Sequence, residues 1–198
     1  MSQPSTSPLP NVIVVAGGLG AGKSTVAAML AAKGATTIDS DQIGHEVLEP
    51  GGPGFAAVAE RWPAVVVDGA IDRQRLAAVV FSDREQLEEL EAITHPAIGA
   101  EIARRAHEAT SGHVVVELPV PAIAAPDWTW IVVVADPAIR VERAVARGME
   151  ADDARRRIAS QLTEAEWRRR ATHVIVNDGS ADDLRVEVDE LWKRLTTS

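Results

Sequence analysis

A glycine-rich run that ends in lysine, serine and threonine carries the clearest chemistry in this sequence. It follows an apolar stretch at 12–16 and reads Gly17-Gly18-Leu19-Gly20-Ala21-Gly22-Lys23-Ser24-Thr25. Strand, glycine loop and helix in this order predict a phosphate site, because backbone N–H groups turn onto phosphate oxygens at the positive end of the helix. Lys23 is expected to reach the β- and γ-phosphates of a nucleotide, and Ser24 to hold a magnesium ion. A glycine turn without a ligand explains neither the Lys-Ser pair nor the strand before it.

Two carboxylates, Asp39 and Asp41, follow a short apolar stretch at 36–38. If this strand lies next to strand 12–16, and if the chain stays extended, both side chains face the nucleotide cleft. A kinase that acts on an alcohol needs a carboxylate to accept the hydroxyl proton, and Asp41 is the candidate base. The alternative for Asp39 or Ser40, equally open, is that it caps a helix beginning near residue 42.

Arginines are concentrated between residues 140 and 170, where nine of them occur. Arg143 and Arg147 are four residues apart, so on a helix they share a face and are expected to neutralise charge on a transferred phosphoryl group. The triplet Arg155–Arg157 is interpreted instead as a solvated helix face paired with nearby acidic residues.

Three further residues have two open readings each. Glu117 follows the apolar stretch 114–116 and either acts on magnesium through water or simply ends the strand. His45 lies one turn past Asp41, and His95 precedes a proline that favours an extended conformation between two helices. For both histidines an acceptor-binding role and a purely structural one are equally open, and their spacing is not that of metal ligands.

The elements that must position these groups follow from the apolar pattern. Continuous Val- and Ile-rich stretches predict parallel strands at 12–16, 36–38, 114–116, 131–135 and 174–176. Helical periodicity occurs at 24–33, 86–93, 97–109, 137–147, 151–162 and 181–195. The alternation predicts an α/β fold with a five-stranded parallel sheet flanked by helices. Residues 42–109 break the alternation and predict a helical insert, interrupted at 49–54.

The chain is expected to form one domain. A length of 198 residues with 46% apolar residues suits a single sizeable core. Residues 1–10 are expected to be a disordered leader, and 11–198 the domain. Within the domain we expect a core at 11–41, 111–139 and 172–198, a helical acceptor-binding insert at 42–110, and an arginine-bearing lid at 140–171.

Bulk properties narrow the classes of partner. The net charge of −9 argues against nucleic acid as the main ligand, and no apolar run approaches the length of a membrane span. No cysteine is present, so thiolate metal sites and disulfides are excluded. The leader has no signal-peptide pattern, which favours a cytoplasmic location. The oligomeric state is not indicated by the sequence.

Taken together, these motifs resemble those of the dephospho-coenzyme A kinases. The resemblance covers most of the chain and rests on the glycine loop, the Asp39-Ser40-Asp41 triplet, and four later landmarks: Glu49-Pro50-Gly51, Asp68-Gly69, His95-Pro96 and Asn177-Asp178-Gly179. It implies a P-loop kinase fold and transfer of the ATP γ-phosphate, with Mg²⁺, to the ribose 3′-hydroxyl of dephospho-coenzyme A. It also implies that Asp41 is the base and that Asn177 and Gly179 lie near the adenine of ATP. The insert, with Asp39, His45 and His95, is expected to bind the acceptor.

The sequence departs from that family at residues 119–125. There the chain reads Pro119-Val120-Pro121-Ala122-Ile123-Ala124-Ala125, with an extra proline and without the family's usual acidic residue. Two other functions therefore remain open from the sequence: a P-loop kinase for another small acceptor, such as a nucleoside, nucleotide or metabolite, and a non-catalytic nucleotide-binding module.

Overall fold

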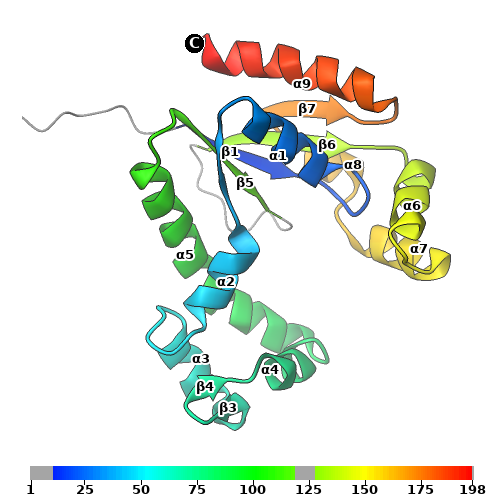
Figure 1. Cartoon of the computed structure of the whole chain (residues 1–198). Coiled ribbons are helices and arrows are strands. Elements are labelled where there is room, and N and C mark those ends of the chain that lie inside the picture. The colour runs from blue at the N-terminus through cyan, green and yellow to red at the C-terminus, as the bar shows by residue number, and fades with distance from the viewer. Residues whose placement is uncertain (1–10, 119–127, 198) are drawn as a thin grey trace, which may run out of the picture. The chain divides into compact units, whose positions relative to one another are not determined.

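The computed structural model describes residues 11–118 and 128–197, and Figure 1 labels their helices and strands. The predictions for the leader at 1–10 and for the loop at 119–125 lie outside the described residues. The described chain divides into two compact units. The first comprises 11–38, 106–118 and 128–197, and the second comprises 39–105.

A five-stranded parallel sheet forms the centre of the first unit. Its strands are β1 (Asn11–Ala16), β2 (Thr36–Ile38), β5 (His113–Glu117), β6 (Thr129–Val134) and β7 (His173–Val176). The residues of β1 after Asn11 are all buried, as expected for a parallel strand that helices cover on both faces. All five strands predicted from apolar runs are confirmed.

The spatial order of the strands, β2-β5-β1-β6-β7, differs from the sequence prediction at one place. Val114 of β5 pairs with Val12 on one side and with Thr36 on the other, so β5 separates β1 from β2. The prediction that strand 36–38 lies next to strand 12–16 is wrong. Burial explains the order, because the apolar centre of β5 suits an inner position, whereas β2 has two exposed threonines and suits the edge.

Helices complete the first unit. Helices α1 (Lys23–Ala32) and α9 (Ala181–Thr196) pack on one face of the sheet, where Leu30 and Val188 join Ile13 and Ile175 in one buried cluster. After β6 come α6 (Pro137–Ala146), α7 (Ala151–Ser160) and α8 (Glu164–Arg168). Helices α1, α6, α7 and α9 lie where periodicity predicted them, to within two residues.

The second unit is mostly helical, as predicted. It contains α2 (Ser40–Val47), α3 (Phe55–Arg61), the 3-10 helix η1 (Pro63–Val65), α4 (Arg73–Val80) and most of α5 (Arg84–Glu108). A short antiparallel hairpin of β3 (Val66–Val67) and β4 (Ala70–Ile71) was not predicted. Its turn places Asp68 and Gly69 at φ 51° and 79°. An Asp-Gly pair between apolar residues is a hairpin signal that the sequence did offer.

Helix α5 contains Pro96 in its interior. The prediction of an extended His95 between two helices is therefore wrong. Proline removes one backbone hydrogen bond, but the buried side chains Ile98 and Ile102 continue the apolar side of the helix past it. In the described part of the chain, no helix combines the length and apolar character needed to cross a membrane.

Candidate active site

Residues 17–22 connect β1 to α1 through a loop whose shape depends on glycine. Gly17, Gly20 and Gly22 have φ values of 144°, 74° and 104°. Gly22 is the N-terminal cap residue of α1, and a Cβ added there would collide with the side-chain amide of Asn177. No side chain among the described residues caps the start of α1, so its first N–H groups can bind an anion.

Ser24 and Glu117 come together beside this loop. The hydroxyl of Ser24, in the first turn of α1, donates a hydrogen bond to Oε1 of Glu117 at the end of β5, 3.1 Å away. These are hard oxygen donors of the kind that Mg²⁺ prefers. Among the described residues no group of three or more His, Cys, Asp or Glu side chains is placed to hold a metal. A magnesium ion here thus fits only as one shared between Ser24, phosphate oxygens and water.

The side chain of Lys23 contacts the phosphate loop. Its Nζ donates to the carbonyl oxygen of Gly18 at 3.3 Å. Burial lowers the pKa of Lys23, Glu117 opposes that effect, and Arg140 and Arg147 add to the lowering. The Lys23 ammonium therefore lies in the field of two arginines and one carboxylate, and its own partial burial leaves room for an anionic ligand to stabilise it.

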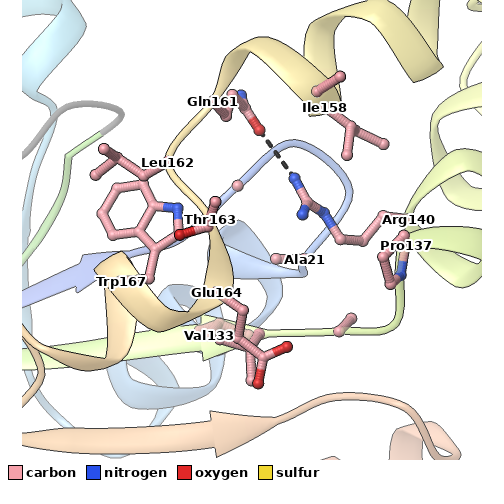
Figure 2. A pocket seen from close by; sticks show the side chains of 14 residues that line it. Ala21, Val133, Pro137, Arg140, Ile158, Gln161, Leu162, Thr163, Glu164 and Trp167 are labelled. Atoms are coloured by element: carbon pink, nitrogen blue, oxygen red, sulfur yellow. Dashed lines mark hydrogen bonds between the residues drawn. The ribbon is translucent and has the colours of Figure 1, made fainter.

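Arg140 is a site residue that the sequence prediction missed. Its Nε donates to the carbonyl oxygen of Leu19 at 2.8 Å, and its Nη2 donates to Oε1 of Gln161 at 2.9 Å, drawn in Figure 2. Gln161 Oε1 also accepts from the backbone N–H of Leu19 at 2.8 Å. The signal was available, because Arg140 precedes Arg143 by three residues and so shares its helix face.

A cavity of about 320 Å³ lies beside the other end of the loop. Asn177 there donates from Nδ2 to the carbonyl oxygen of Ala21 at 2.8 Å and accepts from Arg143 at 3.4 Å. The lining residues are Gly22, Thr25, Arg143, Ala146, Arg147, Asn177, Gly179, Ala181 and Leu184. Two pairs that were predicted independently, Arg143 with Arg147 and Asn177 with Gly179, thus line one cavity. Arg147 is the exposed C-terminal cap residue of α6 rather than part of the helix proper.

The acidic pair adopts a different geometry from the one predicted. Asp39 caps α2 by accepting hydrogen bonds from the backbone N–H groups of Asp41 and Gln42, both at 3.0 Å. Asp41 already lies in the first turn of that helix, and its side chain is exposed. The extended conformation expected for these residues is wrong, and the capping alternative holds for Asp39. Capping wins because it satisfies two N–H groups that the helix itself leaves without partners.

Both candidate histidines belong to the second unit. His45 is exposed in the last turn of α2, and His95 is half-buried in α5. Their acceptor-binding role stays a prediction. In contrast, the reading of the triplet Arg155–Arg157 is confirmed, because all three arginines are ion-paired with Asp152 or Asp153 on α7.

A comparison with known families identifies the group to which this site belongs. The family model described as dephospho-CoA kinase matches residues 11–183. The chain belongs to the dephospho-CoA kinase family. The resemblance stated from the motifs is therefore confirmed, and with it an ATP-dependent kinase that phosphorylates a hydroxyl group.

Individual members of the dephospho-CoA kinase family align along most of their length. A dephospho-CoA kinase of Frankia casuarinae is 40% identical over 185 residues, covering 90% of this chain and 81% of the relative. A dephospho-CoA kinase of Streptomyces avermitilis is 41% identical over 187 residues, covering 90% of this chain and 91% of the relative. The crystal structure of a Thermus thermophilus protein matches with a TM-score of 0.78 and 32% identity, covering 95% of this chain and 99% of the other. The predicted P-loop kinase fold is confirmed.

Proposed function

We propose that this protein transfers the γ-phosphate of ATP to the 3′-hydroxyl of the ribose of dephospho-CoA, the final step of coenzyme A synthesis. The observation that carries the proposal is the identity of about 40% to proteins named dephospho-CoA kinase, together with a complete phosphate loop. The acceptor comes from those names, and the donor from the loop chemistry. A cytoplasmic location stays a prediction of the sequence.

The donor half of the reaction rests on residues of the first unit. We assign the loop residues 17–25 and Lys23 to the phosphates of ATP, and Asn177 and Gly179 to its adenine. Ser24 would hold Mg²⁺, with Glu117 acting on the ion through water. The ion supplies charge neutralisation and orients the phosphates. Arg143 and Arg147 offset charge that develops on the transferred group, since phosphoryl transfer depends mainly on positioning and electrostatics.

The acceptor half rests on the second unit. Asp41 is proposed as the base, because its exposed carboxylate is not used in the helix cap, whereas that of Asp39 is. A carboxylate in this role accepts the hydroxyl proton and orients the oxygen in line with the γ-phosphorus. Asp39, His45 and His95 remain candidates for contacts with the acceptor.

A coupled assay of ADP release across a panel of alcohols tests the proposal. We expect turnover with dephospho-CoA and little with nucleosides, nucleotides or sugar acids. If another alcohol is turned over and dephospho-CoA is not, the assignment of dephospho-CoA as the acceptor is wrong. ATP binding without turnover of any alcohol would indicate a non-catalytic module.

The base assignment has its own test. Asp41→Asn is expected to abolish turnover while ATP binds nearly as in the wild type, because the substitution keeps the shape and removes the proton acceptor. Glu60→Gln, another exposed carboxylate of the second unit, is the control. A wild-type rate in Asp41→Asn contradicts the assignment.

A further inference from the structure

The side chain of Gln161 joins the end of α7 to the phosphate loop, and both belong to the first unit. Its Oε1 accepts two hydrogen bonds, one from the backbone N–H of Leu19 at 2.8 Å and one from Nη2 of Arg140 at 2.9 Å (Figure 2). Arg140 in turn donates from Nε to the carbonyl oxygen of Leu19 at 2.8 Å. The three residues therefore close a ring of hydrogen bonds that holds the guanidinium against the loop.

Local structure holds Gln161 in this place. It is the C-terminal cap residue of α7, and its backbone N–H donates to the carbonyl oxygen of Ile158 at 3.3 Å. Two residues later Thr163 begins α8 with a capping box, in which its hydroxyl and its backbone N–H both donate to Glu166 at 2.7 Å. Gln161 is exposed, and ordering an exposed glutamine costs conformational entropy. A side chain that is nevertheless bonded twice, between two fixed helix ends, indicates a positioning role.

Arg140 is held without being neutralised. It is half-buried, and burial lowers its pKa, an effect that the charge of Glu164 opposes although the described structure has no ion pair between the two. Both acceptors that the described residues supply to it, the Leu19 carbonyl and the Gln161 amide, are uncharged. A partly buried cation with neutral acceptors keeps its full charge for an anionic ligand, because no carboxylate offsets that charge at contact distance.

The guanidinium of Arg140 lies at the γ-phosphate end of the loop. In loops of this kind the lysine reaches the β- and γ-phosphates, and Nζ of Lys23 here donates to the carbonyl oxygen of Gly18 at 3.3 Å. A Cβ added to Gly18 would collide with Nη2 of Arg140 and would lie 2.9 Å from Oε1 of Gln161. The lysine that reaches the γ-phosphate and the arginine that Gln161 holds thus lie against the same loop residue.

We propose that Gln161 is a positioning residue for phosphoryl transfer, which orients Arg140 toward the γ-phosphate of ATP and, as a neutral acceptor, leaves the arginine its full charge. The inference rests on the proposed function for the donor, ATP, and not for the acceptor. Glutamine suits this role better than glutamate, because a carboxylate would pair with the arginine and compete with phosphate for it.

Gln161→Met removes the acceptor atom and keeps the length of the side chain. We expect the Kd for ATP to rise about five- to tenfold and the Kd for ADP to change less than twofold, because only ATP carries the γ-phosphate. The kcat with dephospho-CoA should fall about tenfold, since a misplaced guanidinium stabilises the transition state less. Calorimetric titration without acceptor gives both Kd values. Gln74→Met, on an exposed glutamine of the second unit, is the matched control, and thermal unfolding checks the fold of both variants.

Two further variants show whether Gln161 acts through the arginine. In an Arg140→Ala background, Gln161→Met should change the Kd for ATP less than twofold, because the residue that it positions is gone. Gln161→Glu keeps the acceptor atoms, so a purely structural role predicts wild-type kinetics. The positioning role predicts instead that kcat falls about 10- to 100-fold while the ligand-free protein unfolds at or above the wild-type temperature, because the new carboxylate pairs with Arg140.

The outcomes separate this inference from the proposed function. An unchanged Kd for ATP in Gln161→Met, an equal loss of affinity in the Arg140→Ala background, or wild-type kinetics in Gln161→Glu overturns the positioning role and leaves the proposed function intact. A wild-type protein that binds ATP and does not turn over dephospho-CoA overturns the acceptor of the proposed function, and the Kd values for ATP and ADP still decide the role of Gln161.

Discussion

The hydroxyl of Ser24 donates to Oε1 of Glu117 over 3.1 Å, which joins the first turn of α1 to the end of β5. The contact exists because β5 is the direct neighbour of β1 in the sheet. It gives Glu117 a place in the site that the sequence left undecided between a metal role and a strand end.

Glu117→Gln tests that place. If the carboxylate orients water on Mg²⁺, its loss should raise the Mg²⁺ concentration needed for half-maximal activity about 10- to 100-fold. The measurement is a Mg²⁺ titration at saturating ATP. Glu190→Gln, an exposed carboxylate on α9, is the control. An unaltered titration curve in Glu117→Gln would assign the carboxylate to the strand end alone.

Lys23→Met should lower activity and raise the thermal stability of the ligand-free protein. Activity should fall about 10²- to 10³-fold, because a cation on the transferred phosphate is lost. At pH 7 the ligand-free variant should unfold a few degrees higher than the wild type, since a buried charge has been removed. Steady-state kinetics and thermal unfolding measure the two effects.

The expected gain in thermal stability of Lys23→Met should depend on pH, because burial holds the pKa of Lys23 below its usual 10.5. Between the lowered value and 10.5, the unfolded chain binds more protons than the folded one, so the stability of the wild type rises with pH. The advantage of Lys23→Met should therefore shrink as the pH approaches 10.5. Lys193→Met, on the exposed side of α9, is the control, and an advantage that stays constant with pH contradicts the burial argument.

Gly22 and Gly34 form a matched pair for testing the loop. Their φ values are 104° and 103°, but a Cβ at Gly22 meets the Asn177 amide, whereas one at Gly34 meets nothing within 4 Å. Gly34→Ala should cost about 1–2 kcal/mol of stability from backbone strain alone. Gly22→Ala should cost more and raise the KM for ATP at least about tenfold, because Asn177 must leave its position. Urea unfolding measures the loss of stability, and steady-state kinetics measure the KM for ATP. If both variants lose the same stability and have the same KM for ATP, the role of Asn177 is refuted.

Arg140→Lys tests the arginine that contacts Leu19 and Gln161. Lysine cannot reproduce the forked geometry of these two bonds, so kcat/KM should fall about 100-fold. Arg155→Lys, on an exposed arginine paired with Asp152, should stay within about twofold of the wild type. Comparable losses in both variants would mean that the effect is general electrostatics rather than geometry.

The sequence predicted what depends on local pattern. Buried parallel strands such as β1 are continuous apolar runs, and the glycine loop has a fixed spacing, so both were located correctly. It also predicted that the triplet Arg155–Arg157 is a solvated helix face, because exposed charges on helices are usually solvated.

What the sequence did not predict depends on competition between interactions. Asp39 had two possible uses, and the cap prevailed because two backbone N–H groups needed an acceptor. Pro96 is a strong helix breaker, but the packing of Ile98 and Ile102 outweighs one missing bond. The insertion of β5 between β1 and β2 could not be predicted from neighbouring segments, because strand order is decided by which strands gain most from burial.

The order of the strands also determines when the nucleotide site can first form during synthesis. β1 pairs only with β5 and β6 within the described sheet, and β2 pairs with β5. The glycine loop is therefore synthesised early, but β1, the strand before it, has no hydrogen-bonding neighbour until residues 113–117 leave the ribosome. The second unit, whose strand pair and helix cap are local in sequence, can begin to fold before then, and the nascent chain must keep an apolar β1 unpaired in the meantime.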